Sequence, residues 1–218
     1  MPKLKMPRKS THIDMTAMCD VAFLLLSFFM LATKFKPDEP VVVVTPSSIS
    51  QVILPDADIM LITVDEKGRV FFSVDNKNVR KSLIQDMNDY RGLGLTENEM
   101  NSFAIGGSIG MPFKSMKSYL SADAATRGEL DKTTAGVPTD TSVTNPDNEL
   151  AIWIRSARNN NPQLRICIKA DGKSTYPEVQ KIIATLAGWK IFKFNLITNL
   201  KAIPSGTFAD QAQKTAAK

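Results

Sequence analysis

Cysteine and histidine are almost absent from this sequence, whose 218 residues include two cysteines and a single histidine. Cys19 lies in an apolar run and Cys167 in a strand-like run much later in the chain, so we expect no disulfide between them. His12 stands in a basic leader with no cysteine or second histidine at ligand spacing. These absences exclude a disulfide scaffold, a structural zinc, a bound metal and a Cys/His catalytic pair.

Nucleotide-binding and catalytic motifs are also missing. The stretch from Gly106 to Gly110 reads GGSIG, but the Gly-Lys-Ser/Thr of a phosphate-binding loop does not follow it. No nucleophile, base and orienting group are visible together in the sequence. We therefore expect neither an enzyme nor a bound cofactor.

Charge of one sign is not concentrated in any long segment. The formal net charge is +5, with 22 acidic residues spread among 27 basic ones. A solvated surface and a basic N-terminal end explain this balance better than a nucleic-acid partner does, and no nucleic-acid-binding motif is present. The charged run from Asp123 to Lys132 is accordingly expected to be a solvated helix or loop.

A long hydrophobic run is present only near the N-terminus. The residues from Val21 to Thr33 carry no charge, but they are too few to cross a bilayer core, which takes about 20 residues. A membrane-spanning helix over residues 14–34 must therefore include Asp20. A cleaved signal peptide is the alternative, although the following Leu31 to Lys36 is a poor cleavage site. Cys19 precedes the run instead of ending it, which disfavours a lipoprotein.

The leader predicts the orientation of this helix. Residues 1–13 contain four basic side chains and no acidic one: Lys3, Lys5, Arg8 and Lys9. The positive-inside rule places such a leader in the cytoplasm, although Lys34 and Lys36 weaken the bias. The domain that follows the helix is then expected outside the cytoplasm.

Three polar side chains share one face of the predicted helix. Thr16, Asp20 and Ser27 are separated by four and seven residues, which are close to whole helical turns. An ionised carboxylate within a membrane costs about 2.5–3.5 kcal/mol on insertion scales, so Asp20 should face protein or a wet cavity. There it can bind and release a proton, with Thr16 and Ser27 lining the same pathway. The alternative is that Asp20 lies at the interface and caps the helix, as Asp14 also can.

The stretch from Ile13 to Leu26, IDMTAMCDVAFLLL, resembles the membrane segment of the ExbD/TolR biopolymer-transport family, and Asp20 matches the essential aspartate of that family. Further resemblance lies in VILP at Val52 to Pro55 and in LRICIKADGKSTY at Leu164 to Tyr176. Ala17 departs from the proline that is common at this position in the family, so the geometry at the start of the membrane helix can differ from that of other members. An insertion at about 93–147 exceeds the short family core and resembles longer members from Bacteroidetes-like bacteria.

This resemblance implies a function, a location and partners. Such a protein is implied to be a single-pass protein of the Gram-negative inner membrane with a periplasmic domain. It is implied to work as a homodimer inside an ExbB-like multi-helix channel and to pass proton-motive energy to a TonB-like protein, which powers outer-membrane transport. A TolR-like subunit of a Tol-Pal envelope system is an open alternative. A tethered or secreted periplasmic binding domain is another.

Residues 35–58 read as an extended linker, because they contain four prolines and few helix formers. The valine run that includes Val43 can add a strand to another chain. The family resemblance makes partner docking at Leu54 and Pro55 attractive. The alternatives are an ordinary linker and an edge strand of the same domain.

Residues 59–204 are predicted to form a compact two-layer α/β domain, interrupted by the insertion, with a disordered tail at 205–218. A hairpin turns at Gly68, and a strand with one polar face follows Leu164. Two helical stripes are expected in the core: Val79, Leu83, Met87 and Tyr90, then Leu150, Trp153, Ile154 and Ala157 behind the N-cap Asn148. A third helix opens at Pro177, and a last strand holds Phe192, Phe194 and Leu196.

Overall fold

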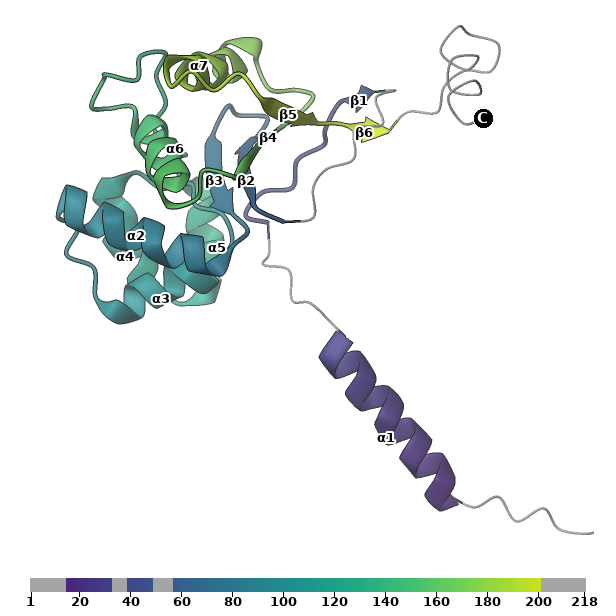
Figure 1. Ribbon diagram of the computed structural model, residues 1–218. Helices are drawn as coiled ribbons and strands as arrows, with labels where there is room; N and C mark the ends of the chain where they lie inside the picture. Colours follow the sequence, from purple (N-terminus) through teal and green to yellow (C-terminus); the bar gives the residue numbers. More distant parts are fainter. Residues whose placement is uncertain (1–14, 33–38, 49–56, 201–218) are drawn as a thin grey trace, which may run out of the picture. The chain divides into compact units, whose positions relative to one another are not determined.

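A computed structural model describes residues 15–32, 39–48 and 57–200 (Figure 1). The chain forms two compact units. The first contains helix α1, Met15–Ala32, and the second contains a domain with a central sheet. The expected leader at 1–13 and the expected tail at 205–218 lie outside the described residues. The fold is mixed α/β with one N-terminal apolar helix, as the sequence predicts.

The sheet of the domain has four strands in the order β3-β2-β4-β5. Strand β3 runs antiparallel to β2, whereas β4 is parallel to both β2 and β5. A separate pair joins β1 to β6 in parallel. The bounds are Ser47–Ser48 (β1), Ile59–Val64 (β2), Val70–Val74 (β3), Arg165–Ala170 (β4), Phe194–Ile197 (β5) and Asn199–Leu200 (β6).

The hairpin between β2 and β3 is confirmed, and its turn has a clear chemical cause. Gly68 adopts φ 78°, a conformation that side-chain-bearing residues rarely take. The carboxylate of Asp65 accepts hydrogen bonds from the backbone N–H groups of Lys67 and Arg69, at 3.0 and 2.8 Å. The Asp65 side chain therefore fixes the turn that the glycine permits.

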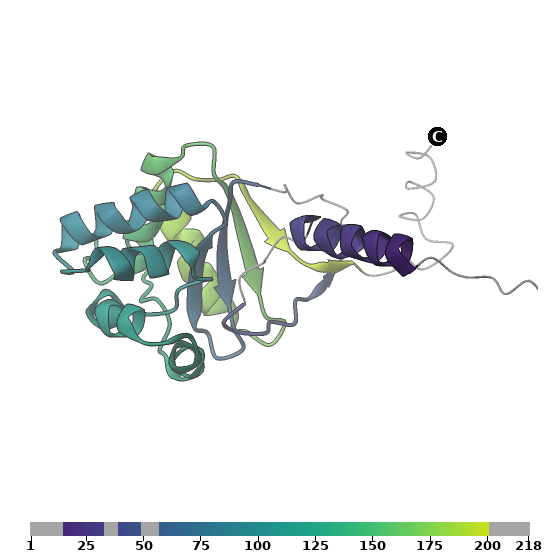
Figure 2. The ribbon, with the colours of Figure 1, turned by 90° about the horizontal axis from the view of Figure 1, so that it is seen from below.

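Helices α2 and α6 pack on the sheet at β3, and in Figure 2 α2–α5 lie together on one side of the sheet. Their starts follow from side-chain caps: Asn76 and Asn148 cap α2 and α6, Thr96 and Glu99 form a capping box at α3, and Pro177 lies in the first turn of α7. The bounds are Lys77–Arg91 (α2), Glu97–Ile105 (α3), Phe113–Ser121 (α4), Ala124–Thr133 (α5), Glu149–Asn160 (α6) and Tyr176–Gly188 (α7).

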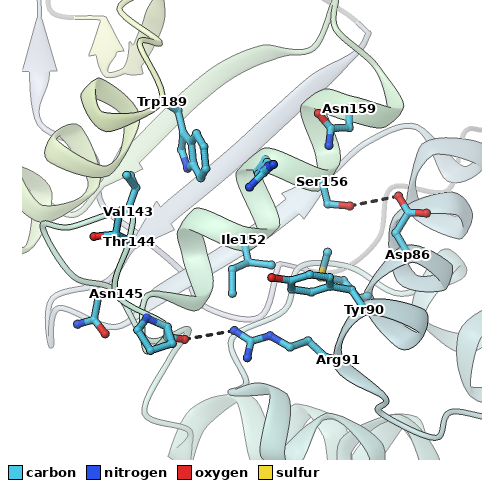
Figure 3. A pocket seen from close by; sticks show the side chains of 13 residues that line it. Asp86, Tyr90, Arg91, Val143, Thr144, Asn145, Ile152, Ser156, Asn159 and Trp189 are labelled. Carbon is cyan, nitrogen blue, oxygen red and sulfur yellow. Dashed lines mark hydrogen bonds between the residues drawn. The ribbon is translucent and has the colours of Figure 1, made fainter.

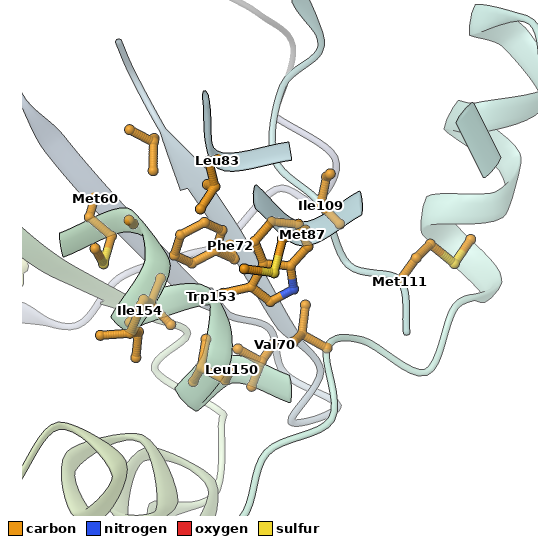
Figure 4. Close-up of a cluster of buried hydrophobic side chains, with 14 of the residues drawn as sticks. Met60, Val70, Phe72, Leu83, Met87, Ile109, Met111, Leu150, Trp153 and Ile154 are labelled. Atoms are coloured by element: carbon orange, nitrogen blue, oxygen red, sulfur yellow. The ribbon is translucent and has the colours of Figure 1, made fainter. Parts of the chain in front are cut away.

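Trp153 of α6 is the centre of the core between these layers (Figure 4). Its ring is fully buried and lies 5.6 Å from the ring of Phe72, 5.7 Å from that of Phe103 and 5.2 Å from that of Phe113. These partners come from β3, α3 and α4. Aromatic packing around one indole therefore joins the insertion to the sheet.

Two details of the predicted core are wrong. Tyr90 follows Val79, Leu83 and Met87 at helical spacing but is 73% exposed, because it lies in the last turn of α2, beyond the core. Cys167, expected on a polar face of β4, is fully buried. It lies in a central strand, opposite Leu61 of β2 and next to β5, so neighbouring strands flank it on both sides.

The insertion closes the outer edge of β3. Phe72 and Ile109 exchange two backbone hydrogen bonds of 2.8 Å, and the N–H of Val137 donates to Val70 O at 2.8 Å. At Gly110 a Cβ atom would lie 2.3 Å from the ring of Phe71, so the glycine allows this close approach. The glycine-rich run thus serves strand pairing, and the edge of the sheet is covered.

Candidate functional site

Helix α1 is an apolar rod without a core of its own. Its 18 residues span about 27 Å at 1.5 Å per residue, close to the thickness of a bilayer hydrocarbon core. None of its side chains is buried within the chain. Across the described ranges 15–32, 39–48 and 57–200, it is the one helix whose length and composition would allow it to cross a membrane. Its leucine, phenylalanine and methionine side chains require a lipid or protein surrounding.

The three predicted polar residues all lie on α1. With 100° per residue, Thr16, Asp20 and Ser27 fall within a sector of about 40°. The hydroxyl of Ser27 donates to Leu24 O at 3.0 Å, which satisfies its hydrogen inside the helix. Asp20 is therefore the one ionisable group on this polar stripe, which is otherwise made of two hydroxyl side chains.

The position of Asp20 in the helix excludes a capping role. The described helix already begins at Met15, five residues before Asp20. An N-cap residue stands outside the first helical turn, where its side chain reaches free N–H groups. The carboxylate of Asp20 instead projects from the helix wall. The proton-binding role of Asp20 stays a prediction, as does its alternative position at the membrane interface.

The segment from Glu39 to Ser48 lies against the domain. Val44 N–H donates to the carboxylate of Asp171 at 2.9 Å, and Gly172 N–H donates to Val44 O at 2.9 Å. Lys169 and Glu39 form an ion pair of 2.6 Å. Hydrogen bonds from backbone N–H groups, including that of Val44, lower the pKa of Asp171. This end of the expected linker is therefore fastened to the turn that follows β4.

Of the three side chains proposed for partner docking, Val43 lies within the described residues. Val43 is buried against the domain, whereas its neighbours Val42 and Val44 are 88% and 68% exposed. A crevice of about 580 Å³ runs beside them, towards the β2–β3 turn and the turn after β4. Leu54 and Pro55 lie outside the described residues. The docking role of Val43, Leu54 and Pro55 stays a prediction.

A buried polar pair in the insertion was missed, because the charged run around it reads as solvated. The hydroxyl of Tyr119 donates to the carboxylate of Asp131 at 3.1 Å, and both residues are buried. Burial raises the pKa of both groups. Nearby, burial lowers the pKa of Arg80 to about 10, and its guanidinium donates to Phe103 O at 2.6 Å. No local sequence signal links Tyr119 to Asp131, because the two residues lie on different helices.

The buried pair of Tyr119 and Asp131 joins two helices of the insertion. Tyr119 lies on α4 and Asp131 on α5, so their bond ties two short helices together. In the part of the chain that the structure describes, no three histidine, cysteine or acidic side chains gather as metal ligands. The polar stripe of α1 therefore remains the strongest candidate site.

Comparison with known proteins identifies the family of the chain. A family model described as Biopolymer transport protein ExbD/TolR matches residues 6–201, which include α1, the segment from Glu39 to Ser48 and the whole described domain. No curated protein and no solved structure matches the chain. Because the match extends over most of the sequence, this chain belongs to the ExbD/TolR family of biopolymer transport proteins.

Proposed function

We propose that this protein is the proton-binding subunit of an energy-transducing complex in the inner membrane of a Gram-negative bacterium. The observation that carries the proposal is Asp20, a carboxylate on the polar stripe of an apolar helix that buries none of its own side chains. A charge in such a position needs protein or water around it. The helix of a single subunit supplies neither.

The surrounding is proposed to be an ExbB-like multi-helix membrane protein, with a homodimer of this chain at its centre. Proton binding at Asp20 removes the charge, and proton release restores it. Each exchange changes which helix–helix arrangement is favoured, and a proton that crosses the membrane potential carries about 2.3 kcal/mol per 100 mV. Thr16 and Ser27 line the same face as the carboxylate.

The domain is proposed to lie in the periplasm and to pass the motion of the helix to a TonB-like protein. The basic leader supports a cytoplasmic N-terminus. The exposed side chains of Val42 and Val44, beside a crevice, support a contact surface near the start of the domain. Among the described strands, none pairs with β5 on the side away from β4 in the four-stranded sheet, which supports pairing of two copies through this strand.

The test replaces Asp20 by asparagine, which keeps the size of the side chain and removes its titration. Asp20→Asn should still insert and assemble with the channel protein, yet abolish energised uptake. A matched control exchanges two neighbours, Cys19→Asp with Asp20→Cys. It keeps the composition of the helix but turns the carboxylate by about 100° away from the stripe.

The exchange variant should be as inactive as Asp20→Asn if the face of the helix matters. Normal uptake by Asp20→Asn would refute proton binding at this residue. Full activity of the exchange variant would refute the claim that the carboxylate must lie on the same helix face as Thr16 and Ser27. Two further measurements separate the alternatives. Co-purification with Tol proteins instead of TonB-like ones would indicate the TolR-like role. A mature protein that lacks residues 1 to about 33 would indicate a secreted binding domain.

A further inference from the structure

A groove on the helical side of the domain is not explained by proton coupling. It has a volume of about 490 Å³ and lies between the end of α2, the outer face of α6, the loop at 143–146 and Trp189 (Figure 3). This volume falls within the range of ordinary ligand pockets. The groove belongs entirely to the domain, so what it binds is independent of Asp20.

The charge available in the groove is positive. Arg91 and Arg155 line it, and neither makes a salt bridge with any residue that the structure describes. The carboxylate of Asp86 also lines it, but one oxygen already accepts hydrogen bonds from Ser156 at 3.3 Å and Asn160 at 2.6 Å. The lining therefore carries two guanidinium groups against one carboxylate, a formal charge of +1.

Both guanidinium groups are held in place by aromatic rings. The guanidinium of Arg155 lies 5.1 Å from the ring of Trp189, and that of Arg91 lies 5.4 Å from the ring of Phe113. Arg91 also donates to Pro146 O at 3.2 Å, as Figure 3 shows. A guanidinium that contacts a ring through its face keeps N–H groups at its edge for a carboxylate.

The loop at 143–146, which forms one wall of the groove, is held by hydrogen bonds on both sides of it. The side-chain amide of Asn148 donates to Asp140 O at 2.8 Å and to Ser142 O at 3.0 Å, while the hydroxyl of Thr185 donates to Asp140 O at 2.7 Å. Asn148 and Thr185 are fully buried. A wall that is already ordered costs little conformational entropy on binding.

We propose that this groove binds an acidic, extended segment of another protein. Carboxylates on the segment pair with Arg91 and Arg155, and apolar side chains between them contact Tyr90, Ile152 and Trp189. The ends of this chain do not suit the groove. The leader is basic, and residues 201–218 carry Lys201, Lys214 and Lys218 against Asp210. Like charge would oppose their binding.

The test uses the full-length chain in detergent and the probe acetyl-Glu-Leu-Glu-Leu-Glu-amide, with its Gln-Leu counterpart as the uncharged reference. Binding is read from the fluorescence of Trp189. Trp189→Phe should remove the change in emission, because Trp153, the other tryptophan, is buried in the core. The Glu probe should bind at least tenfold more tightly than the Gln probe, and salt should weaken it.

Two arginine variants and one control identify the groove. Arg91→Gln and Arg155→Gln should each weaken the Glu probe about twofold to fivefold, as expected for solvent-exposed ion pairs, and together by more. The control Lys81→Gln removes an exposed charge from α2 outside the groove and should leave binding unchanged.

Several results would overturn the proposal. Equal binding of the two probes would show that charge is not recognised, and no binding of the Glu probe up to 1 mM would show that the groove is not such a site. Tighter binding of inorganic tripolyphosphate than of the Glu probe would indicate a general anion site. Trp189 emission that depends on protein concentration, and loses that dependence in Arg155→Gln, would indicate a second copy of this chain as the occupant.

Discussion

Asn148 combines two roles whose energies can be separated by substitution. Its Oδ1 accepts a hydrogen bond from Ala151 N–H at 3.1 Å and caps α6. Its Nδ2 lies within 2.8–3.1 Å of three acceptors, the carbonyls of Asp140 and Ser142 and the hydroxyl of Thr185. An amide group has two hydrogens, so at most two of these acceptors are served fully at once.

The magnitude follows from this arrangement. Loss of an N-cap costs about 1 kcal/mol, and each of two buried hydrogen bonds contributes about 1 kcal/mol, so Asn148→Ala should lower the free energy of unfolding by about 3 kcal/mol. Asn148→Ser keeps a good cap but cannot reach the loop. It should lose only the part due to the two buried hydrogen bonds, about 2 kcal/mol.

The assay is urea unfolding of the full-length chain in detergent, followed by tryptophan fluorescence. With a slope of about 2 kcal/mol per molar urea, Asn148→Ala should shift the midpoint down by about 1.5 M and Asn148→Ser by about 1 M. Asn145→Ala in the neighbouring loop is a control that leaves the cap intact. If Asn148→Ser unfolds at the same midpoint as the unsubstituted chain, the loop anchors contribute nothing and the reasoning is refuted.

Three further perturbations test other parts of the domain. Gly110→Ala should cost about 1–3 kcal/mol of unfolding free energy, because its Cβ would lie 2.3 Å from the buried ring of Phe71; an unchanged thermal midpoint would contradict this packing. Burial raises the pKa of Asp131 above about 4, the usual value of a free carboxyl. The free energy of unfolding should therefore fall relative to that of Asp131→Asn as pH rises above about 4, and parallel pH profiles of the two proteins would exclude the raised pKa. Hydrogen bonds lower the pKa of Asp171, so the stability they give is present above about pH 4 and is lost as pH falls further. The protection factor of the Val44 amide, which is its exchange rate corrected for the pH dependence of intrinsic exchange, should fall on acidification and in Asp171→Ala; an unchanged protection factor would exclude this anchor.

Local chemistry made several elements of the domain predictable. Gly68 between two β-branched runs predicted the hairpin, and Asn148 and Pro177 predicted the starts of α6 and α7. Each signal lies within a few residues of the element it sets, and each is a backbone preference that tertiary contacts reinforce. The polar stripe on α1 was predictable for the same reason, because helical spacing alone aligns Thr16 with Asp20.

Features that depend on distant segments were not predictable. The burial of Cys167 depends on the neighbouring strands β2 and β5, and the exposure of Tyr90 depends on where the core ends beneath α2. Arg155 gave no signal, since its contact with Trp189 joins residues 34 positions apart. The sequence also did not show that the insertion would form three helices, because α5 has four charged residues among its ten and no apolar stripe.

The backbone pairing of Ile109 and Val137 with β3 limits how copies of this domain can combine. A sheet with two free margins can keep adding neighbours and grow into a fibre. Here β3 already pairs with Ile109 and Val137, so among the described strands of the four-stranded sheet β5 is the edge strand left for a second copy. Two copies that pair through β5 would therefore form a closed dimer and not a longer array.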